Sequence, residues 1–324
     1  MSKTLQFVIC PIVCLLLGLP SCIKDDLTNC PPVEQSLQVI FSCEDAAVPE
    51  SQPELQNATL FVFDKNDVFV TSWRLDASHP ERPSLNKMYV PDFKLLPGEY
   101  HFVVWFDLLP PYSITPAVSG FLRGTTRIDQ AAFQLEIPGN RTIETPLPRL
   151  LYGYKSGEIK TRSENILAIP VTQQTNTVNI VVTGLPPTTD EYLFRITDTN
   201  GNYTFLNAFA DCEAFSYTDV NRISTASQTL TGSLTVLKLA ENRPTPLLVI
   251  QNQTTGKQVF PRDNGADEQG NLIEIIRREH PGNDFDRTHT YTIHIDIDDT
   301  NVTVNVSVDG WNEKPSDNEL SPTY

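Results

Sequence analysis

The sequence has 324 residues, of which 40 are acidic and 24 are basic, so its formal net charge is −16 at neutral pH. This charge argues against a nucleic-acid partner, because phosphate contacts require clustered Lys and Arg. Hydrophobic residues make up 40% of the chain, which also holds 25 Pro and 15 Gly. Such a composition is typical of a packed globular protein rich in strand ends and turns.

The first segment of the chain is typical of a secretory signal peptide. Lys3 supplies a positive start, and residues 5–19 form an apolar run that is too short to span a membrane. The run ends at Leu19-Pro20-Ser21-Cys22, which resembles the bacterial lipobox, whose cysteine is lipidated and becomes the first residue of the mature chain. We expect a signal peptide over residues 1–21 and a lipid on Cys22. An ordinary signal peptide followed by a disulfide-bonded cysteine is the alternative.

The lipid is expected to hold the mature protein on a membrane. Several acyl chains on one cysteine are sufficient for stable anchoring, whereas the acidic chain would be repelled by anionic head groups. Lys24, Asp25 and Asp26 follow the lipid site and resemble the signal that sends some Gram-negative lipoproteins to the outer face of the outer membrane. A solvated tether is the alternative interpretation of these charges. Residues 22–35, which include the stiff Cys30-Pro31-Pro32, are expected to form a lipidated tether.

The mature chain is long enough for about two domains. Pro146 and Pro148 precede a fresh start of strand-like sequence at residues 169–171 and 178–182. Turn residues at regular intervals and little helical periodicity predict an all-β fold of two sandwiches. The expected segments are an N-terminal β-sandwich over residues 36–160, a C-terminal β-sandwich over residues 161–312 and a polar tail over residues 313–324.

Four segments of the first half have the β-branched and aromatic composition of strands. They are residues 37–41, 60–63, 68–70 and 100–106. The segment from Leu60 to Val70 is echoed by the segment from Leu193 to Phe205, each with an Asp-containing turn at its centre. The echo suggests the same strand-turn-strand unit in both halves, although hairpin chemistry alone also produces such a likeness.

The end of the chain shows the clearest alternation of apolar and polar residues. Every second residue is apolar from Tyr291 to Ile297 and again from Val302 to Val308. Two such runs joined by a polar turn predict a β-hairpin. Trp311 follows the second run and is expected to pack at the end of a core.

One helix is expected before this hairpin. Leu272, Ile275, Ile276 and Glu279 share one helical face. Asp267 and Glu268 precede the segment, and Arg277-Arg278 end it, which suits the helix dipole. The pattern predicts a short surface helix.

No motif of the sequence indicates catalysis or metal binding. The five His lack zinc-ligand spacing, and the nucleophile-elbow, P-loop and dinucleotide-binding patterns do not occur. Carboxylates cluster at Asp296, Asp298 and Asp299 and again at Asp263, Asp267 and Glu268. Acidic turns are a commoner cause of such clusters than a calcium site or a glycosidase pair. We therefore expect no catalytic residue, no cofactor and no metal ion.

The cysteines of the mature chain leave an odd number after lipidation. Cys30, Cys43 and Cys212 remain once Cys22 carries lipid. A strand over residues 35–43 would hold Cys30 and Cys43 too far apart for a bridge. A bridge from Cys212 to either of them, or three separate thiols, are the open alternatives.

Several short segments follow one another in a characteristic order along the mature chain. They are residues 22–27, 30–32, 96–100, 103–105, 151–153, 175–178, 284–287 and 308–312. Together with the lipobox, this order resembles the FimB/Mfa-type fimbrial anchor family. Phe106 stands where we would expect a family-like cysteine, so the disulfide pattern of relatives is not carried over.

The resemblance implies two tandem transthyretin-like Greek-key β-sandwiches tethered by lipid at the outer membrane surface. It also implies a non-enzymatic role, in which the protein anchors a fimbrium and takes part in its assembly and length control. The implied partners are fimbrillin and accessory fimbrial subunits, joined by β-strand exchange. The tail lacks alternating apolar residues, so we expect the protein to accept a strand in a groove. The alternative function is a surface lipoprotein that binds a glycan or a host ligand through exposed aromatics such as Trp73 or Tyr112, although packing in a core or a loop is the commoner role of such aromatics.

Overall fold

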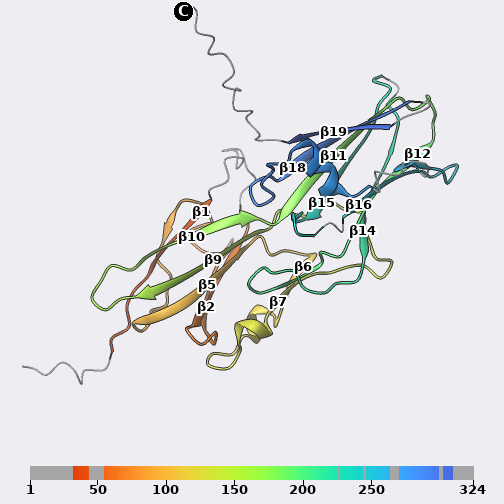
Figure 1. Cartoon of the computed structure of the whole chain (residues 1–324). Helices are drawn as coiled ribbons and strands as arrows, with labels where there is room; N and C mark the ends of the chain where they lie inside the picture. The colour runs from red at the N-terminus through yellow and green to blue at the C-terminus, as the bar shows by residue number, and fades with distance from the viewer. Residues whose placement is uncertain are drawn as a thin grey trace, which may run out of the picture. The chain divides into compact units, whose positions relative to one another are not determined.

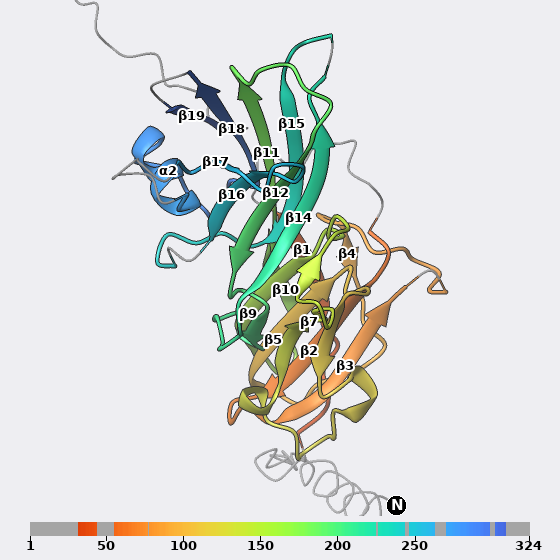
Figure 2. The same ribbon diagram turned by 90° about the vertical axis from the view of Figure 1, so that its right-hand side faces the viewer.

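The computed structural model of the protein describes residues 32–43, 55–76, 78–224, 226–243, 246–262, 270–298 and 302–308. Nearly all of the regular elements in these ranges are β-strands, and they form several sheets (Figures 1 and 2). The all-β prediction is therefore confirmed. The tandem transthyretin-like arrangement and the division at residue 160 stay predictions.

A seven-stranded sheet contains the strands expected in the first half of the chain. In spatial order its strands are β3 (Phe69–Leu75), β2 (Ala58–Asp64), β5 (Gly98–Phe106), β9 (Leu151–Ile159), β10 (Ile166–Gln173), β1 (Gln38–Cys43) and β4 (Met88–Tyr89). Strands β1 and β10 run parallel, and the other neighbouring pairs are antiparallel. The four expected strands are confirmed as β1, β2, β3 and β5.

Strand β2 is buried on both faces, which explains why its apolar residues form a continuous run and do not alternate with polar ones. Leu60 and Val62 belong to the smaller of two hydrophobic cores. Phe61 and Phe63 belong to the larger core, where the ring of Phe61 lies edge-on to that of Phe205 with a centroid distance of 5.0 Å. The seven-stranded sheet therefore separates the two cores at this strand.

Three further sheets surround the larger core. A four-stranded sheet has the order β15 (Leu230–Leu237), β11 (Thr175–Thr183), β18 (Thr290–Ile297) and β19 (Val302–Val308). A five-stranded sheet has the order β17 (Gln258–Phe260), β16 (Leu247–Asn252), β12 (Glu191–Asp198), β14 (Phe215–Arg222) and β8 (Thr142–Ile143). The smallest sheet joins β13 (Asn202–Thr204), β7 (Ala132–Leu135) and β6 (Tyr112–Thr115), with the 3-10 turns η2 (Val118–Gly120) and η3 (Ile128–Gln130) nearby in the chain.

The predicted hairpin and the predicted helix are both confirmed. Strands β18 and β19 pair antiparallel from Tyr291 opposite Val308 to Ile297 opposite Val302. Helix α2 (Leu272–Glu279) lies beside β19 (Figure 2). Its apolar residues are buried. Its first turn is capped by the side chain of Asn271, which accepts hydrogen bonds from two backbone N–H groups. Trp311, Asp267 and Glu268 lie outside the described residues.

The internal echo is only partly confirmed. Strands β2 and β3 form the expected hairpin, and the Asp64 carboxylate accepts hydrogen bonds from two backbone N–H groups of the turn, those of Asn66 and Val68. In the second copy, β13 pairs with β7 and not with β12. The physical reason is that β14 and β16 occupy both edges of β12, so no edge remains for residues 202–204. The second segment is thus two strands joined by a turn, as the sequence suggests, but the two strands do not pair with each other as β2 and β3 do.

The packing of the five-stranded sheet on the four-stranded sheet explains one strand glycine. A Cβ atom at Gly232 in β15 would lie 2.7 Å from the buried ring of Phe194 in β12. We expect Gly232→Ala to lower the free energy of unfolding by about 1–3 kcal/mol, because overpacking forces neighbouring groups to move. Urea denaturation would measure this loss. Gly139→Ala is the matched control, because no atom lies within 4 Å of its added Cβ. Equal losses in the two variants would contradict the packing argument.

Candidate functional site

The site residues predicted at the N-terminus lie outside the described residues. This applies to Cys22, Lys24, Asp25 and Asp26, and also to Cys30. Cys43 lies in β1 and Cys212 lies in the loop before β14, and the two are not bonded to each other. Within the described ranges, no helix is long and apolar enough to cross a membrane.

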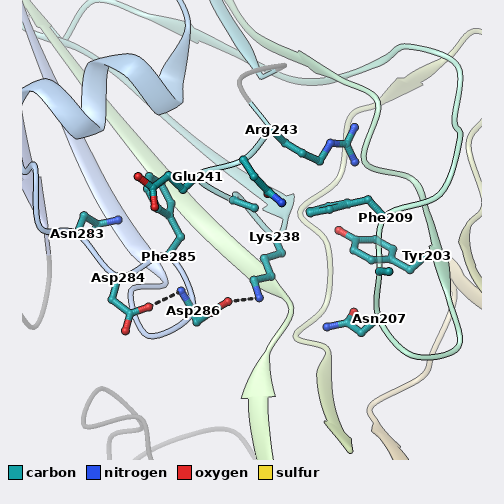
Figure 3. Close-up of a pocket in the computed structure, with 13 residues that line it drawn as sticks. Tyr203, Asn207, Phe209, Lys238, Glu241, Arg243, Asn283, Asp284, Phe285 and Asp286 are labelled. Carbon is teal, nitrogen blue, oxygen red and sulfur yellow. Dashed lines mark hydrogen bonds and ion pairs between the residues drawn. The ribbon is translucent and has the colours of Figure 1, made fainter.

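A pocket of about 900 Å³ forms where three loops meet (Figure 3). The loops follow β13, follow β15 and lie between α2 and β18. In Figure 3, Tyr203, Phe209 and Arg243 lie on one side, and Asp284, Phe285 and Asp286 lie on the other. Lys238 lies between them.

The first side of the pocket is a stack of aromatic and cationic groups. The ring centroids of Tyr203 and Phe209 are 5.0 Å apart. The guanidinium carbon of Arg243 lies 4.2 Å from the Phe209 centroid, a cation–π contact. Arg243 Nη2 also donates to Thr199 Oγ1. These contacts fix the guanidinium at the edge of the pocket.

The second side carries carboxylates that already have cationic partners. Asp286 pairs with Lys238 across the pocket. An Asp284 oxygen lies 3.7 Å from Arg287 Nε, and the other accepts a hydrogen bond from the backbone N–H of Asp286 at 2.9 Å. Glu241 lies 3.4 Å from Arg277 Nη2. The acidic groups of the lining are therefore largely neutralised locally.

Four buried polar atoms of the lining have no hydrogen-bond partner among the described residues. They are Tyr203 Oη, Asn207 Oδ1, Arg243 Nη1 and Asn283 Oδ1. The amide nitrogens of the two asparagines are engaged, with Gln174 Oε1 at 3.0 Å for Asn207 and Tyr291 Oη at 3.2 Å for Asn283. Buried polar groups are seldom left unsatisfied, so this concentration in one pocket marks it as a candidate binding site.

The Tyr203 hydroxyl is held in its protonated form. Burial raises its pKa well above the ordinary value, and the nearby Asp198 carboxylate raises it further, although Arg243 lowers it. The net pKa lies far above neutral pH. Tyr203 therefore offers the pocket a neutral hydroxyl that donates one hydrogen bond.

A pair of buried tyrosines tests whether the Tyr203 hydroxyl is unsatisfied. Tyr217 Oη donates to Asn200 Oδ1 at 3.0 Å and accepts from Leu237 N at 3.2 Å. We expect Tyr217→Phe to lower the free energy of unfolding by about 1–3 kcal/mol, because its partners lose their hydrogen bonds. Tyr203→Phe should leave this free energy unchanged or raise it, because the lost hydroxyl has no described partner. Urea denaturation would compare the variants, and a larger loss for Tyr203→Phe would contradict the assignment.

Sheet edges are a second kind of candidate site, because an unpaired edge is a template for strand addition. The edge strand β15 is capped by side chains of β14, with Asp219 Oδ2 accepting from Ser233 N at 3.0 Å and Tyr217 Oη accepting from Leu237 N. At β19, His280 Nε2 lies 2.7 Å from Val306 O. Strands β4, β8 and β17 have only two or three residues each.

The edge strand β3 is different. It has seven residues. Loop residues engage its first residue, because Phe69 N donates to Thr126 O and Phe69 O accepts from Gly124 N. From Val70 to Leu75, no described strand pairs with its outer side. Within the described residues, β3 is therefore an edge that lies open over most of its length.

Sequence reasoning did not find most of the pocket. Its residues come from segments far apart in the chain and form no motif, although residues 284–287 belong to the family-like segments. Trp73 and Tyr112 are named above as ligand-binding aromatics for the alternative function only, with core packing as their commoner role, and core packing is what the structure shows. They are 6% and 4% exposed and belong to the hydrophobic cores.

Comparison with known proteins gives a family and a fold. A family model described as fimbrillin-A associated anchor proteins Mfa1 and Mfa2 matches residues 27–317. None of the curated proteins matches the sequence.

Among solved structures, a candidate polysaccharide-binding protein from Bacteroides thetaiotaomicron shares 21% identity, with a TM-score of 0.67 over 85% of this chain and 96% of that one. The fimbrial anchor protein Mfa2 from Porphyromonas gingivalis shares 18% identity, with a TM-score of 0.66 over 86% and 98% of the two chains. A candidate adhesin from B. thetaiotaomicron shares 16% identity, with a TM-score of 0.62 over 85% and 97%. These structures share the fold of the chain.

Proposed function

Because the chain belongs to the family of fimbrillin-A associated anchor proteins Mfa1 and Mfa2, we propose that it anchors a fimbrium to the cell surface. The family match over residues 27–317 carries this proposal. The proposed role is structural and not enzymatic. Its partners are fimbrial subunits, namely fimbrillin and accessory subunits.

Lipid on Cys22 is the proposed membrane attachment. The lipobox and the short apolar run before it support lipidation, and the net charge of −16 disfavours attachment by charge to anionic head groups. Lys24, Asp25 and Asp26 are the proposed signal for export to the outer face of the outer membrane. Residues 22–35 then act as a tether between the lipid and the first strands.

Strand exchange is the proposed way in which the anchor holds a fimbrial subunit. An added strand gains a ladder of backbone hydrogen bonds along an open edge. The outer edge of β3 from Val70 to Leu75 is the proposed acceptor, because the β15 and β19 edges are contacted by other groups of the chain. An anchor whose own N-terminus carries lipid ends the chain of subunits at the membrane, so the supply of anchor relative to fimbrillin sets the length of the fimbrium.

Site-specific photo-cross-linking tests the acceptor edge. A photo-reactive residue at Ser72 in β3 should cross-link to a fimbrial subunit on intact cells. Lys155 is the matched control, because it is exposed but lies in β9, an interior strand of the same sheet. Cross-links from Thr235 in β15, with none from Ser72, would show that the acceptor is the edge of the four-stranded sheet and not β3. Cross-links from none of these positions would contradict strand exchange at both edges.

Deletion of the gene tests anchoring itself. We expect fimbriae to leave the cell and collect in the medium, because the membrane end of the fimbrium is lost. Electron microscopy of the cells and immunoblots of the medium would measure this release. Normal numbers of cell-attached fimbriae in the deletion strain would contradict the anchor function, whatever the cross-links show.

A further inference from the structure

The pocket beside Tyr203 has the size and the unsatisfied groups of a ligand site. Its volume of about 900 Å³ lies within the range of roughly 300–1,000 Å³ that is typical of small-molecule pockets. Tyr203 is 2% exposed, and its hydroxyl points into the pocket (Figure 3). We propose that this pocket binds a short neutral oligosaccharide. This inference does not depend on the proposed anchor function.

The unsatisfied atoms match the hydroxyl groups of a sugar. Tyr203 Oη and Arg243 Nη1 are donors, whereas Asn207 Oδ1 and Asn283 Oδ1 are acceptors. A sugar hydroxyl both donates and accepts hydrogen bonds, so neighbouring hydroxyls on one ring satisfy both kinds of atom. Phe209 and Phe285 add apolar surface to the same lining, which suits the C–H groups of a sugar ring. A purely apolar ligand would leave all four atoms unsatisfied.

The charges of the lining favour a neutral ligand over an acidic one. Asp286, Asp284 and Glu241 each lie within ion-pair distance of a cation, and Lys238 is already paired with Asp286. Arg243 makes no ion pair within the described part of the chain, but the net charge of −16 repels a polyanion at long range. The unsatisfied Nη1 of Arg243 can donate its hydrogen bond to a neutral hydroxyl group, so its partner need not be a carboxylate.

The backbone around the pocket disfavours an extended peptide. Strand β13 carries Tyr203, and one of its edges pairs with β7. Its other edge is occupied by the chain that follows it, because Thr204 N donates to Ala208 O at 2.7 Å and Ala210 N donates to Asn202 O at 3.0 Å. A peptide strand gains its affinity from an open backbone edge, and β13 offers none here.

Titration calorimetry on the full mature protein in detergent tests the proposal. The probes are the neutral hexasaccharides cellohexaose, laminarihexaose, mannohexaose and maltohexaose, with the galacturonic acid hexamer as the acidic comparison. We expect at least one neutral hexasaccharide to bind in the micromolar to millimolar range and more tightly than the acidic hexamer. No binding by any neutral probe at millimolar concentration, or tighter binding of the acidic hexamer, would overturn the proposal. The proposal would also be overturned if a peptide of alternating Val and Thr bound to the protein and the Tyr203→Phe substitution abolished that binding.

Two substitutions connect binding to the pocket. Tyr203→Phe and Arg243→Gln should each weaken binding about tenfold, because each removes one hydrogen bond to a buried ligand. Tyr154→Phe is the matched control, because Tyr154 lies in β9 and bonds His101 away from the pocket. Thermal unfolding separates loss of binding from loss of fold, since Tyr203→Phe should unfold at or above the parent temperature. Unchanged affinity in both pocket variants would overturn the assignment of the site.

Discussion

Replacing Cys22 by alanine is expected to abolish palmitate labelling and to move the protein from the membrane fraction to a soluble or unprocessed form. The reason is that the lipobox cysteine is the acceptor of the lipid, and the acidic chain has no charge attraction to anionic head groups. Cell fractionation with labelled palmitate would measure both effects. Membrane retention of a processed Cys22→Ala protein would contradict lipid anchoring.

The neighbouring charges provide a control that separates lipidation from export. Replacement of Asp25 and Asp26 together by asparagine should leave palmitate labelling and membrane fractionation unchanged. If these residues form the export signal, the same variant should become protected from protease added to intact cells. Protease sensitivity equal to that of the parent would leave Cys22 as the anchor but would contradict the export role.

The elements that could be predicted from the sequence are those whose pattern is local. The β18–β19 hairpin is visible because each of its residues faces either the core or solvent, so side chains alternate along the strand. Helix α2 is visible because its apolar residues and its terminal charges fit one short helix. The pairing of the second strand-turn-strand unit could not be predicted, because the partners of β12 come from distant segments, β14 and β16, and nothing within residues 193–205 reveals them.

The candidate pocket could not be predicted for a related reason. Tyr203, Lys238, Arg243 and Asn283 are common residue types in loops, and only the fold brings them together. What marks the site is the absence of hydrogen-bond partners for buried atoms in the described chain, which is a property of tertiary structure. Burial likewise removed Trp73 from the candidate ligand residues, because its ring faces the smaller core.

A second large effect, on stability, is expected at Asp107. This buried carboxylate connects the ends of three strands of the seven-stranded sheet. The residue follows β5 directly, and its Oδ1 accepts hydrogen bonds from Gln56 N at 2.7 Å and Asn57 N at 3.3 Å, just before β2. Its Oδ2 lies 3.4 Å from Nη2 of Arg149, just before β9, and the two side chains are 8% and 14% exposed. Its φ of 54° lies in the left-handed region, which Asp and Asn tolerate better than most residues.

We expect Asp107→Ala to lower the free energy of unfolding by about 3–5 kcal/mol, because it removes the carboxylate from a buried ion pair and leaves the Arg149 charge in place. Asp107→Asn should lose less, because its amide oxygen still accepts the two backbone hydrogen bonds and its backbone tolerates the same φ. Adding Arg149→Met to Asp107→Ala should recover part of the loss, since the second substitution removes the buried cation that has lost the Asp107 carboxylate. Urea denaturation of Asp107→Ala, of Arg149→Met and of the double variant would give the coupling energy between the two residues in a double-mutant cycle. The same measurement would be made on Asp107→Asn. Strictly additive losses would mean that Asp107 stabilises the sheet through its backbone hydrogen bonds and not through Arg149.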